Sequence, residues 1–199
     1  QINKGMSFTV RGNYTFSQNI IDYYEENKLP YDYLSVTGKP FNILRGYIAE
    51  GLFSSKEEIN TSADQSGFGR IRPGDIKYRD VNGDGIINDD DKTYHNGHLD
   101  KTPRSVYGLS FNADWKGFFA GIFFQGVSGA SINLMSKASN FMPFNQGKDA
   151  SSARMEAMSR WKASDPYNDN VLYPRLRNNT FAHNLQPSTW WYRDASFIR

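Results

Sequence analysis

The chain has no cysteine among its 199 residues, which excludes disulfide scaffolds, zinc–thiolate sites and thiol catalysis. It has no run of about 18 apolar residues that could cross a membrane as a helix. Neither sign of charge dominates, because 23 basic and 21 acidic residues give a net charge of +2, and no basic block suggests nucleic acid as a partner. Serine-nucleophile, phosphate-loop and dinucleotide motifs are lacking, and no pair of carboxylates stands apart. The sequence therefore predicts a protein that is not an enzyme.

Aromatic residues and glycines are abundant instead. Aromatics reach 15% with 12 Tyr, 14 Phe and 4 Trp, and there are 17 Gly, whereas hydrophobic residues make up only 38%. This composition suits a β-barrel wall, in which only every second residue faces lipid. The chain starts without methionine and ends within an apolar alternation, so we expect a fragment of a longer protein.

Strict alternation of apolar and polar residues predicts strands over 7–17 and 105–116. A turn at Lys116-Gly117 leads into another alternating segment from Phe118, which predicts a hairpin. In a soluble sandwich the apolar face would pack inward, and in a membrane barrel it would face lipid with the polar face toward the lumen. The period alone leaves both open.

The segments between and after these strands are less regular. Phe41–Phe53 and Asp75–Tyr78 read as strand-like, but glycines and Glu50 spoil a lipid face, so we expect neither to cross a membrane. Residues 149–162 form the one helix candidate of any length, with Asp149 as its cap, and Ser55 can cap a short turn toward Glu58. The last residues, 188–199, read as the opening of a further strand.

The stretch from Gly74 to Lys92 has the spacing of an EF-hand calcium loop. Its ligand positions hold Asp80, Asn82, Asp84, the backbone carbonyl of Ile86, Asn88 and Asp91, and glycine stands at the sharp turn in position 6. The last ligand is Asp rather than Glu, and the shorter side chain predicts a weak site with Kd on the order of 10⁻⁴ M. A surface turn rich in Asp, Asn and Gly without a metal is the alternative.

Several motifs together resemble the SusC/RagA family of TonB-dependent outer-membrane transporters of Bacteroidetes. They are Gly-Tyr-Ile-Ala-Glu-Gly-Leu-Phe (46–53), Arg-Pro-Gly-Asp-Ile-Lys-Tyr-Arg-Asp-Val-Asn-Gly-Asp-Gly (72–85), Pro-Arg-Ser-Val-Tyr-Gly-Leu-Ser-Phe (103–111), Phe-Phe-Gln-Gly (123–126), Tyr-Pro-Arg-Leu (173–176) and Trp-Tyr-Arg-Asp-Ala-Ser-Phe-Ile-Arg (191–199). Their order and spacing extend over most of the chain, so the resemblance is more specific than the calcium loop alone.

The resemblance implies an all-β fold, with residues 1–199 as part of a 22-stranded antiparallel transmembrane barrel with long extracellular loops. The calcium loop (74–92) and the short helix (149–162) would lie in those loops. It also implies import of oligosaccharides across the bacterial outer membrane, with a SusD-like lipoprotein as lid and energy from the TonB complex through a segment outside this chain. Candidate contacts for the solute are Arg11, Asn13, Asn112, Gln125, Trp190 and Trp191.

Two alternatives to an oligosaccharide importer are a peptide importer of the RagA type and a secreted calcium-binding module of the dockerin type. Dockerins carry the loop twice with a helix after each copy. This chain has one copy, followed by Thr-Tyr-His-Asn-Gly (93–97), which does not start a helix.

Overall fold

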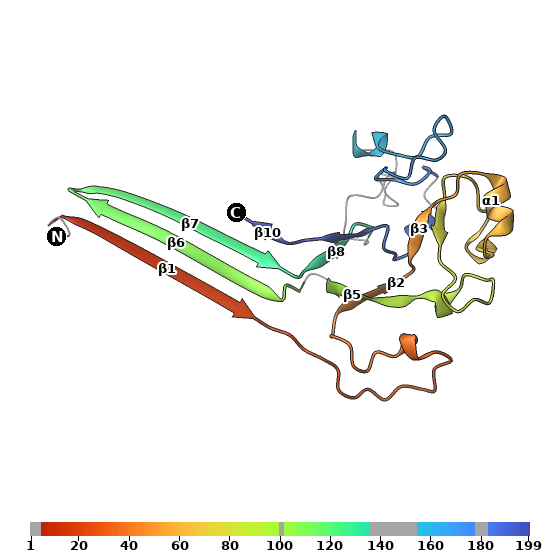
Figure 1. Ribbon diagram of the computed structural model, residues 1–199, viewed down its shortest axis with the longest axis horizontal. Helices are drawn as coiled ribbons and strands as arrows, with labels where there is room; N and C mark the ends of the chain where they lie inside the picture. The colour runs from red at the N-terminus through yellow and green to blue at the C-terminus, as the bar shows by residue number, and fades with distance from the viewer. Residues whose placement is uncertain (1–4, 100–101, 136–154, 178–182) are drawn as a thin grey trace, which may run out of the picture.

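The computed structural model describes residues 5–99, 102–135, 155–177 and 183–199. Figure 1 shows a long flat sheet at one end and a lobe of short strands, turns and short helices at the other. Most described residues with regular structure lie in strands, so the chain belongs to the all-β class. No described helix is long and apolar enough to cross a membrane.

The long sheet contains four strands in the order β1 (Met6–Phe16), β6 (Ser105–Trp115), β7 (Phe118–Ser128) and β10 (Phe197–Ile198), with antiparallel neighbours. Trp115 pairs with Phe118 across a two-residue turn, in which Lys116 and Gly117 have φ of 49° and 88°. Positive φ at both turn residues matches the twist of the flanking strands. The three long strands and the hairpin expected from the alternation are confirmed.

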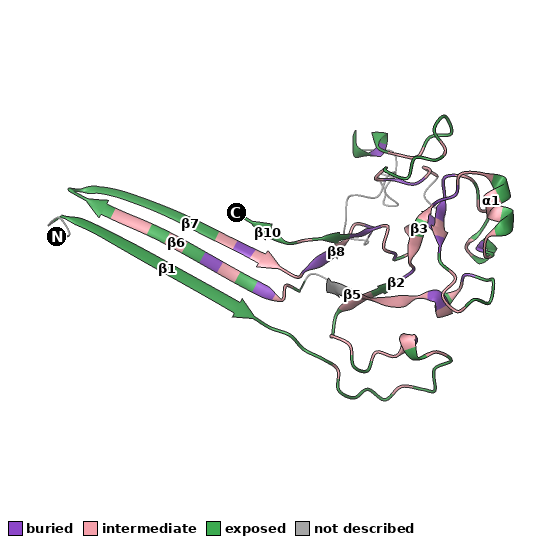
Figure 2. Cartoon of the chain, viewed as in Figure 1, coloured by how far each residue is buried: buried purple, intermediate pink, exposed green. Residues whose placement is uncertain are grey.

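Cross-strand register places most of the apolar residues of the three long strands on one face. Phe111 lies between Val10 and Ile122, and Leu109 lies between Gly12 and Phe124. Nothing in the described chain covers this face, since Leu109 remains 39% and Phe111 42% exposed and every residue of β1 is exposed (Figure 2). The described residues therefore do not build a two-sheet sandwich core on this face.

Residues 17–104 form one long connection, because β1 and β6 that flank it are direct neighbours in the sheet. Within it, β2 (Ile43–Gly46) pairs with β5 (Thr93–Leu99), and β3 (Ala49–Leu52) pairs with β4 (Ile76–Tyr78). Neither pair joins the long sheet, so Phe41–Phe53 and Asp75–Tyr78 do not extend it. Strand β5 was missed by sequence reasoning, because its polar, glycine-containing start is typical of a loop.

The lobe has a small core that is rich in aromatic rings. Its buried members come from the long connection and from three later segments of the described chain: Tyr47, Leu52, Ile76, Tyr78, Ile87, Met135, Ala157, Tyr173 and Trp191. The segment before β9 (Tyr192–Asp194) is tied to this core, because Tyr47 N donates to Pro187 O at 2.9 Å and Thr189 N donates to Tyr47 O at 3.0 Å. Strand β9 pairs with β8 (Ser131–Asn133), which follows β7.

Short helices complete the lobe. Helix α1 (Lys56–Thr61) begins after Ser55, whose hydroxyl accepts a hydrogen bond from Glu58 N at 3.1 Å, as the sequence predicted. The 3-10 helices are η1 (Asp32–Leu34), η2 (Ser66–Phe68), η3 (Asp89–Asp91), η4 (Met155–Met158) and η5 (His183–Leu185).

The helix expected at 149–162 differs from the structure. Residues 149–154 lie outside the described residues, Met155–Met158 form a single 3-10 turn, and Arg160 and Lys162 already form isolated bridges. The bridge of Arg160 with Tyr173 gives the backbone a partner outside the segment, and this pairing replaces the helix.

Candidate functional site

The first half of the calcium loop forms a series of tight turns closed by its own side chains. The Asp80 carboxylate accepts hydrogen bonds from Gly83 N at 2.7 Å and Gly85 N at 2.8 Å, and Asp84 Oδ1 accepts one from Ile86 N at 2.8 Å. Gly83 and Gly85 have φ of 76° and 82°, a region that glycine enters without strain. Asp80, Asn82 and Asp84 thus stand on one sharply curved stretch of backbone.

The second half of the loop is fixed to the lobe. Asp64 N donates to Gly85 O and Ile87 N donates to Asp64 O, both at 2.8 Å, so the Ile86 carbonyl between them points away from Asp64. Asp91 is fully buried, and its two carboxylate oxygens accept from Val81 N at 2.7 Å and Asn88 N at 2.8 Å. Tyr33 hydroxyl also donates to Asp90 O at 2.6 Å.

The donor set of this loop fits a hard cation, since it offers carboxylate, amide and carbonyl oxygens. The carboxylates do not converge, however: within the described residues no three His, Cys, Asp or Glu side chains come close enough to hold a metal ion. Asp91 acts here as a cap for backbone N–H groups of Val81 and Asn88. Calcium binding by this loop stays a prediction.

The four polar candidates on the long strands lie on one face of the sheet, opposite the apolar face. Asn13 and Gln125 flank Gly108 in the cross-strand register, whereas Arg11 pairs with Ser110 and Asn112 with Thr9. Phe119 and Phe123 also lie on this face, which sequence reasoning had not noted. The sheet therefore brings together Arg11, Asn13, Asn112 and Gln125 and leaves the other two candidates elsewhere.

The two tryptophan candidates lie in the lobe, and the structure corrects one of them. Trp191 is 1% exposed and donates its indole N–H to Asn184 O at 2.8 Å, so it belongs to the core and cannot stack on a solute. Trp190 is half-buried and donates its indole N–H to Leu172 O at 3.2 Å. Two adjacent tryptophans indicate an aromatic cluster, but no local pattern tells which of the two rings packs inward.

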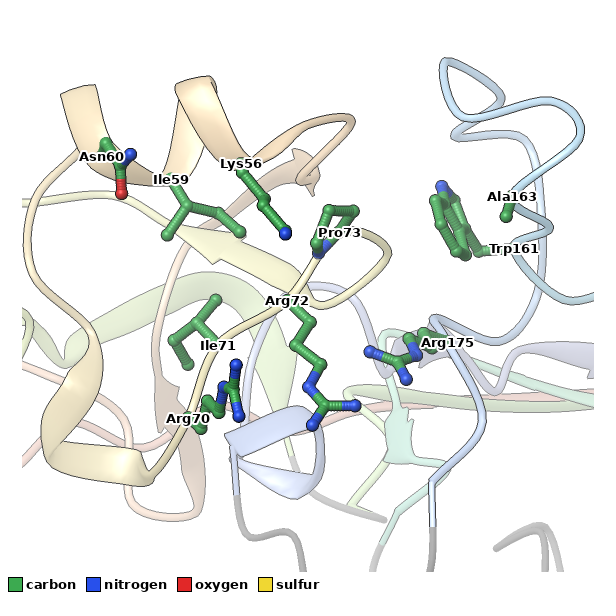
Figure 3. Close-up of a pocket in the computed structure, with 10 residues that line it drawn as sticks. All are labelled: Lys56, Ile59, Asn60, Arg70, Ile71, Arg72, Pro73, Trp161, Ala163 and Arg175. Atoms are coloured by element: carbon green, nitrogen blue, oxygen red, sulfur yellow. The ribbon is translucent and has the colours of Figure 1, made fainter.

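A basic groove in the lobe was missed entirely by sequence reasoning (Figure 3). It has a volume of about 700 Å³, and its lining comes from helix α1, residues 70–73, residues 161–163 and Arg175. The arginines are spread over more than a hundred positions of the sequence, so no local spacing could have indicated them.

Comparison with known proteins agrees with this description. The TonB-dependent receptor P26 of Formosa agariphila is 28% identical to the chain over 167 residues, which cover 82% of the chain and 15% of that receptor. The predicted resemblance to TonB-dependent receptors is confirmed. No family model matches the chain.

Among solved structures, the RagAB peptide transporter has the same fold over the whole chain, with a TM-score of 0.57 and 15% identity. The match covers 100% of the chain and 20% of that transporter chain. The chain thus spans only 15% to 20% of the length of the TonB-dependent receptor and the transporter chain that it matches.

Proposed function

We propose that the chain forms part of the wall and the extracellular loops of an outer-membrane importer that is driven by the TonB complex. A SusD-like lipoprotein would close over the loops, and oligosaccharides would be the solutes. The wall would belong to a 22-stranded barrel, and Arg11, Asn13, Asn112 and Gln125 would face its lumen and offer hydrogen bonds to hydroxyl groups. Support comes from the similarity to the Formosa receptor and from the fold that the chain shares with RagAB.

The uncovered apolar face of the long sheet is the observation that carries this proposal. Strands β1, β6 and β7 are 11 residues long each, which is the length that a tilted strand needs to cross the hydrocarbon core. Exposed apolar side chains such as Phe8 and Phe118 would be costly in water, because hydrating apolar surface is unfavourable. Soluble proteins accordingly rarely expose large continuous apolar surfaces. Hydrocarbon around the barrel removes that cost.

The turn at Lys116-Gly117 supports one orientation in the membrane. Barrels of this kind have short turns on the periplasmic side and long loops outside, so the lobe, which lies at the opposite end of these strands, would be extracellular (Figure 1). In that orientation the lobe would meet a lid and an incoming solute.

Cysteine labelling of the intact receptor tests the membrane assignment. Leu109→Cys and Ser110→Cys are neighbours in β6 on opposite faces of the sheet, and this chain contributes no other cysteine. We expect a lipid-soluble maleimide to react with Leu109→Cys, and a charged, water-soluble thiol reagent to react only with Ser110→Cys. Rapid reaction of Leu109→Cys with the charged reagent in assembled outer membranes would overturn the assignment.

The choice between oligosaccharide and peptide needs a separate measurement, since the neighbour of like fold is a peptide transporter. Cells that depend on the intact receptor are expected to grow on oligosaccharides as carbon source, and deletion of the receptor should abolish that growth. Growth lost only on peptides would assign the receptor to the RagA-type alternative.

As a second function besides transport, we propose that the loop 80–91 binds calcium. The turns closed by Asp80 and Asp84, together with the outward carbonyl of Ile86, favour this site. Calorimetric titration of the intact receptor with calcium should give binding heat that Asp80→Ala removes and that Asp165→Ala, an exposed acid outside the loop, retains. An absence of binding heat in the parent receptor would defeat this proposal.

A further inference from the structure

The basic groove of the lobe has four cations along its walls and no acidic residue. Figure 3 shows Arg70, Arg72 and Arg175 along one side of the opening, with Lys56 near Pro73. The remaining lining residues are Ile59, Asn60, Ile71, Pro73, Trp161 and Ala163. Like charges gathered in one hollow attract an anion, and the apolar residues between them lower the local dielectric constant and strengthen that attraction.

These cations are available to a ligand. The ion pairs among the described residues are Lys77 with Glu58, Arg79 with Glu50, Lys92 with Asp89, and Arg177 with Asp75. None of the four groove cations takes part in them. The planar guanidinium groups of the arginines can each bind a carboxylate or sulfate through two parallel N–H groups.

A buried network below the groove fixes the backbone that carries Arg70 and Arg72. Arg177 donates to Arg70 O at 3.0 Å and pairs with the Asp75 carboxylate, which also accepts from Arg72 N at 2.8 Å. Asn184 Nδ2 donates to the other Asp75 oxygen at 3.0 Å, and Asp75 is fully buried. The arginine side chains therefore project from a rigid base, which reduces the entropy lost when a ligand binds.

Trp161 supplies a flat apolar surface in the same groove. Its ring packs on Gly74, where φ is 86° and no side chain would fit, and its indole N–H donates to Pro166 O at 3.0 Å. Trp161 N is held by Tyr173 O at 2.9 Å, and the ring is partly exposed. An indole that is fixed at its edge and open on a face can stack against the apolar C–H face of a sugar ring.

The backbone of the loop offers little to a peptide. Peptides are commonly held by main-chain hydrogen bonds to an exposed strand edge. Here Gly74 N donates to Phe53 O and Arg175 N donates to Gly74 O, both at 2.6 Å, and Asp75 N donates to Arg72 O at 3.1 Å. Recognition must therefore come from the side chains, which are cationic and aromatic.

We propose that this groove binds acidic oligosaccharides, meaning chains of sugars that bear carboxylate or sulfate groups. The anionic groups pair with Arg70, Arg72, Arg175 and Lys56, while one sugar ring stacks on Trp161. This inference rests on the proposed function and narrows its solute from oligosaccharides in general to acidic ones.

Titration calorimetry on the intact receptor tests the groove with four probes. The three oligosaccharides are matched in length, and the peptide is matched in charge to the acidic oligosaccharides. The probes are an oligogalacturonate, a sulfated oligogalactan, a neutral oligogalactan and an oligoglutamate peptide. We expect the oligogalacturonate, the sulfated oligogalactan or both to bind at least about tenfold more tightly than the neutral chain, and to weaken as salt rises. Tighter binding of the peptide than of either acidic saccharide would overturn the proposal.

Variants locate the binding. Arg72→Gln with Arg175→Gln, and separately Trp161→Ala, should each weaken acidic oligosaccharide binding about tenfold or more. Arg79→Gln is the matched control, because Arg79 is an exposed arginine outside the groove that pairs with Glu50 at 2.9 Å. Unchanged affinity in the groove variants would overturn the proposal. Arg72→Lys with Arg175→Lys, which keeps the charge, should retain part of the affinity and thereby separates loss of binding from loss of folding.

The cysteine labelling of Leu109 and Ser110 keeps this test independent of the proposed function. If labelling is as expected but the groove variants bind normally, the acidic-oligosaccharide proposal is refuted and the importer proposal stands. Water-soluble labelling of Leu109→Cys removes the importer, whatever the groove binds.

Discussion

The long sheet and the lobe use the same residue types in opposite ways. In the sheet, Phe8 and Phe118 are 70% and 76% exposed, whereas in the lobe Tyr47, Tyr173 and Trp191 are almost completely buried (Figure 2). The sheet sorts apolar and polar residues onto two faces, and the lobe sorts them into inside and outside. The proposed function accounts for this difference by two solvents, with hydrocarbon beside the sheet and water around the lobe. Substitutions in either region should therefore obey different rules.

Loss of a core ring in the lobe should have the largest effect. Trp191→Ala removes a buried indole and its hydrogen bond to Asn184 O, which we expect to cost about 3–5 kcal/mol of the lobe's stability. Protease cleavage of the lobe in assembled receptor, followed against temperature, measures this loss. Trp190→Ala, at a half-buried ring, should cost clearly less. Equal effects would mean that the lobe lacks the core described above.

A charge on the apolar face of the sheet should come next. Phe111→Lys places a cation on that face near the middle of β6 and should destabilise the assembled barrel by about 2–4 kcal/mol, if hydrocarbon surrounds it. Asn112→Lys, one residue away on the polar face, should change stability little. Heat-induced unfolding of the receptor in lipid vesicles compares the two variants. Near-equal unfolding temperatures would remove the contrast between the two solvents.

Acid should weaken the lobe through His183. This side chain is fully buried, with Asn184 Oδ1 3.0 Å from Nδ1 and Gln65 Oε1 2.8 Å from Nε2. Burial lowers the pKa of His183 from 6.5 to about 4, the hydrogen bond with Asn184 opposes this, and Arg177 adds to it. The unfolded chain takes up a proton on His183 below pH 6.5, whereas the folded chain does so only near pH 4. The free energy of unfolding therefore falls by roughly 3 kcal/mol as the pH is lowered from 6.5 to 4.

The pH dependence of lobe unfolding, compared with His183→Gln, isolates this effect. The variant should show a flatter decline between pH 6.5 and 4, since glutamine does not titrate. The pKa of Asp75 is raised, because burial outweighs the opposing effect of Arg177. A raised carboxyl pKa favours the folded state at lower pH, which is opposite to the effect of His183, and this contribution is the same in both proteins. Identical slopes in the two proteins would refute the role of His183.

The smallest effect is expected in the loop that leads from β1 into the lobe. The Glu26 carboxylate accepts from Ser35 Oγ at 2.6 Å, Val36 N at 2.8 Å and Thr37 Oγ1 at 2.9 Å. The hydrogen bonds from Ser35 and Val36 lower the pKa of Glu26 to about 2. The carboxylate therefore accepts these hydrogen bonds above that pH, and the interaction is lost as the pH falls through it. Glu26→Gln should speed amide hydrogen exchange at Val36 and leave the sheet unchanged. Unaltered exchange at Val36 would show that the carboxylate does not hold the loop.

The sheet could be predicted from sequence because its chemistry is periodic. Leu109, Phe111 and their neighbours alternate with polar residues, so strand, face and hairpin register follow from one local rule. The cap of α1 at Ser55 was also predictable from local sequence, because a hydroxyl three residues before Glu58 is a capping signal. Local patterns also placed the calcium motif on a tightly turned loop.

Features that depend on distant partners were beyond this reasoning. Strand β5 exists because β2 pairs with it, and the turn at Met155–Met158 stops where Arg160 meets Tyr173. Trp191 is in the core and Trp190 is only half-buried, which depends on how residues 187–192 cross Tyr47. The groove arginines meet only after the chain has folded, and one buried carboxylate, Asp75, holds the backbone of Arg72 and the side chain of the neighbouring Arg177 in place.

The direct pairing of β1 with β6 makes the sheet independent of the long segment that connects them. Their register is set by cross-strand contacts from Met6 with Trp115 to Phe16 with Ser105, none of which involves residues 17–104. That segment can be exchanged for another with matching ends without disturbing the wall. If the lobe binds the solute as proposed, grafting residues 17–104 together with the other lobe segments onto a related barrel should transfer solute preference.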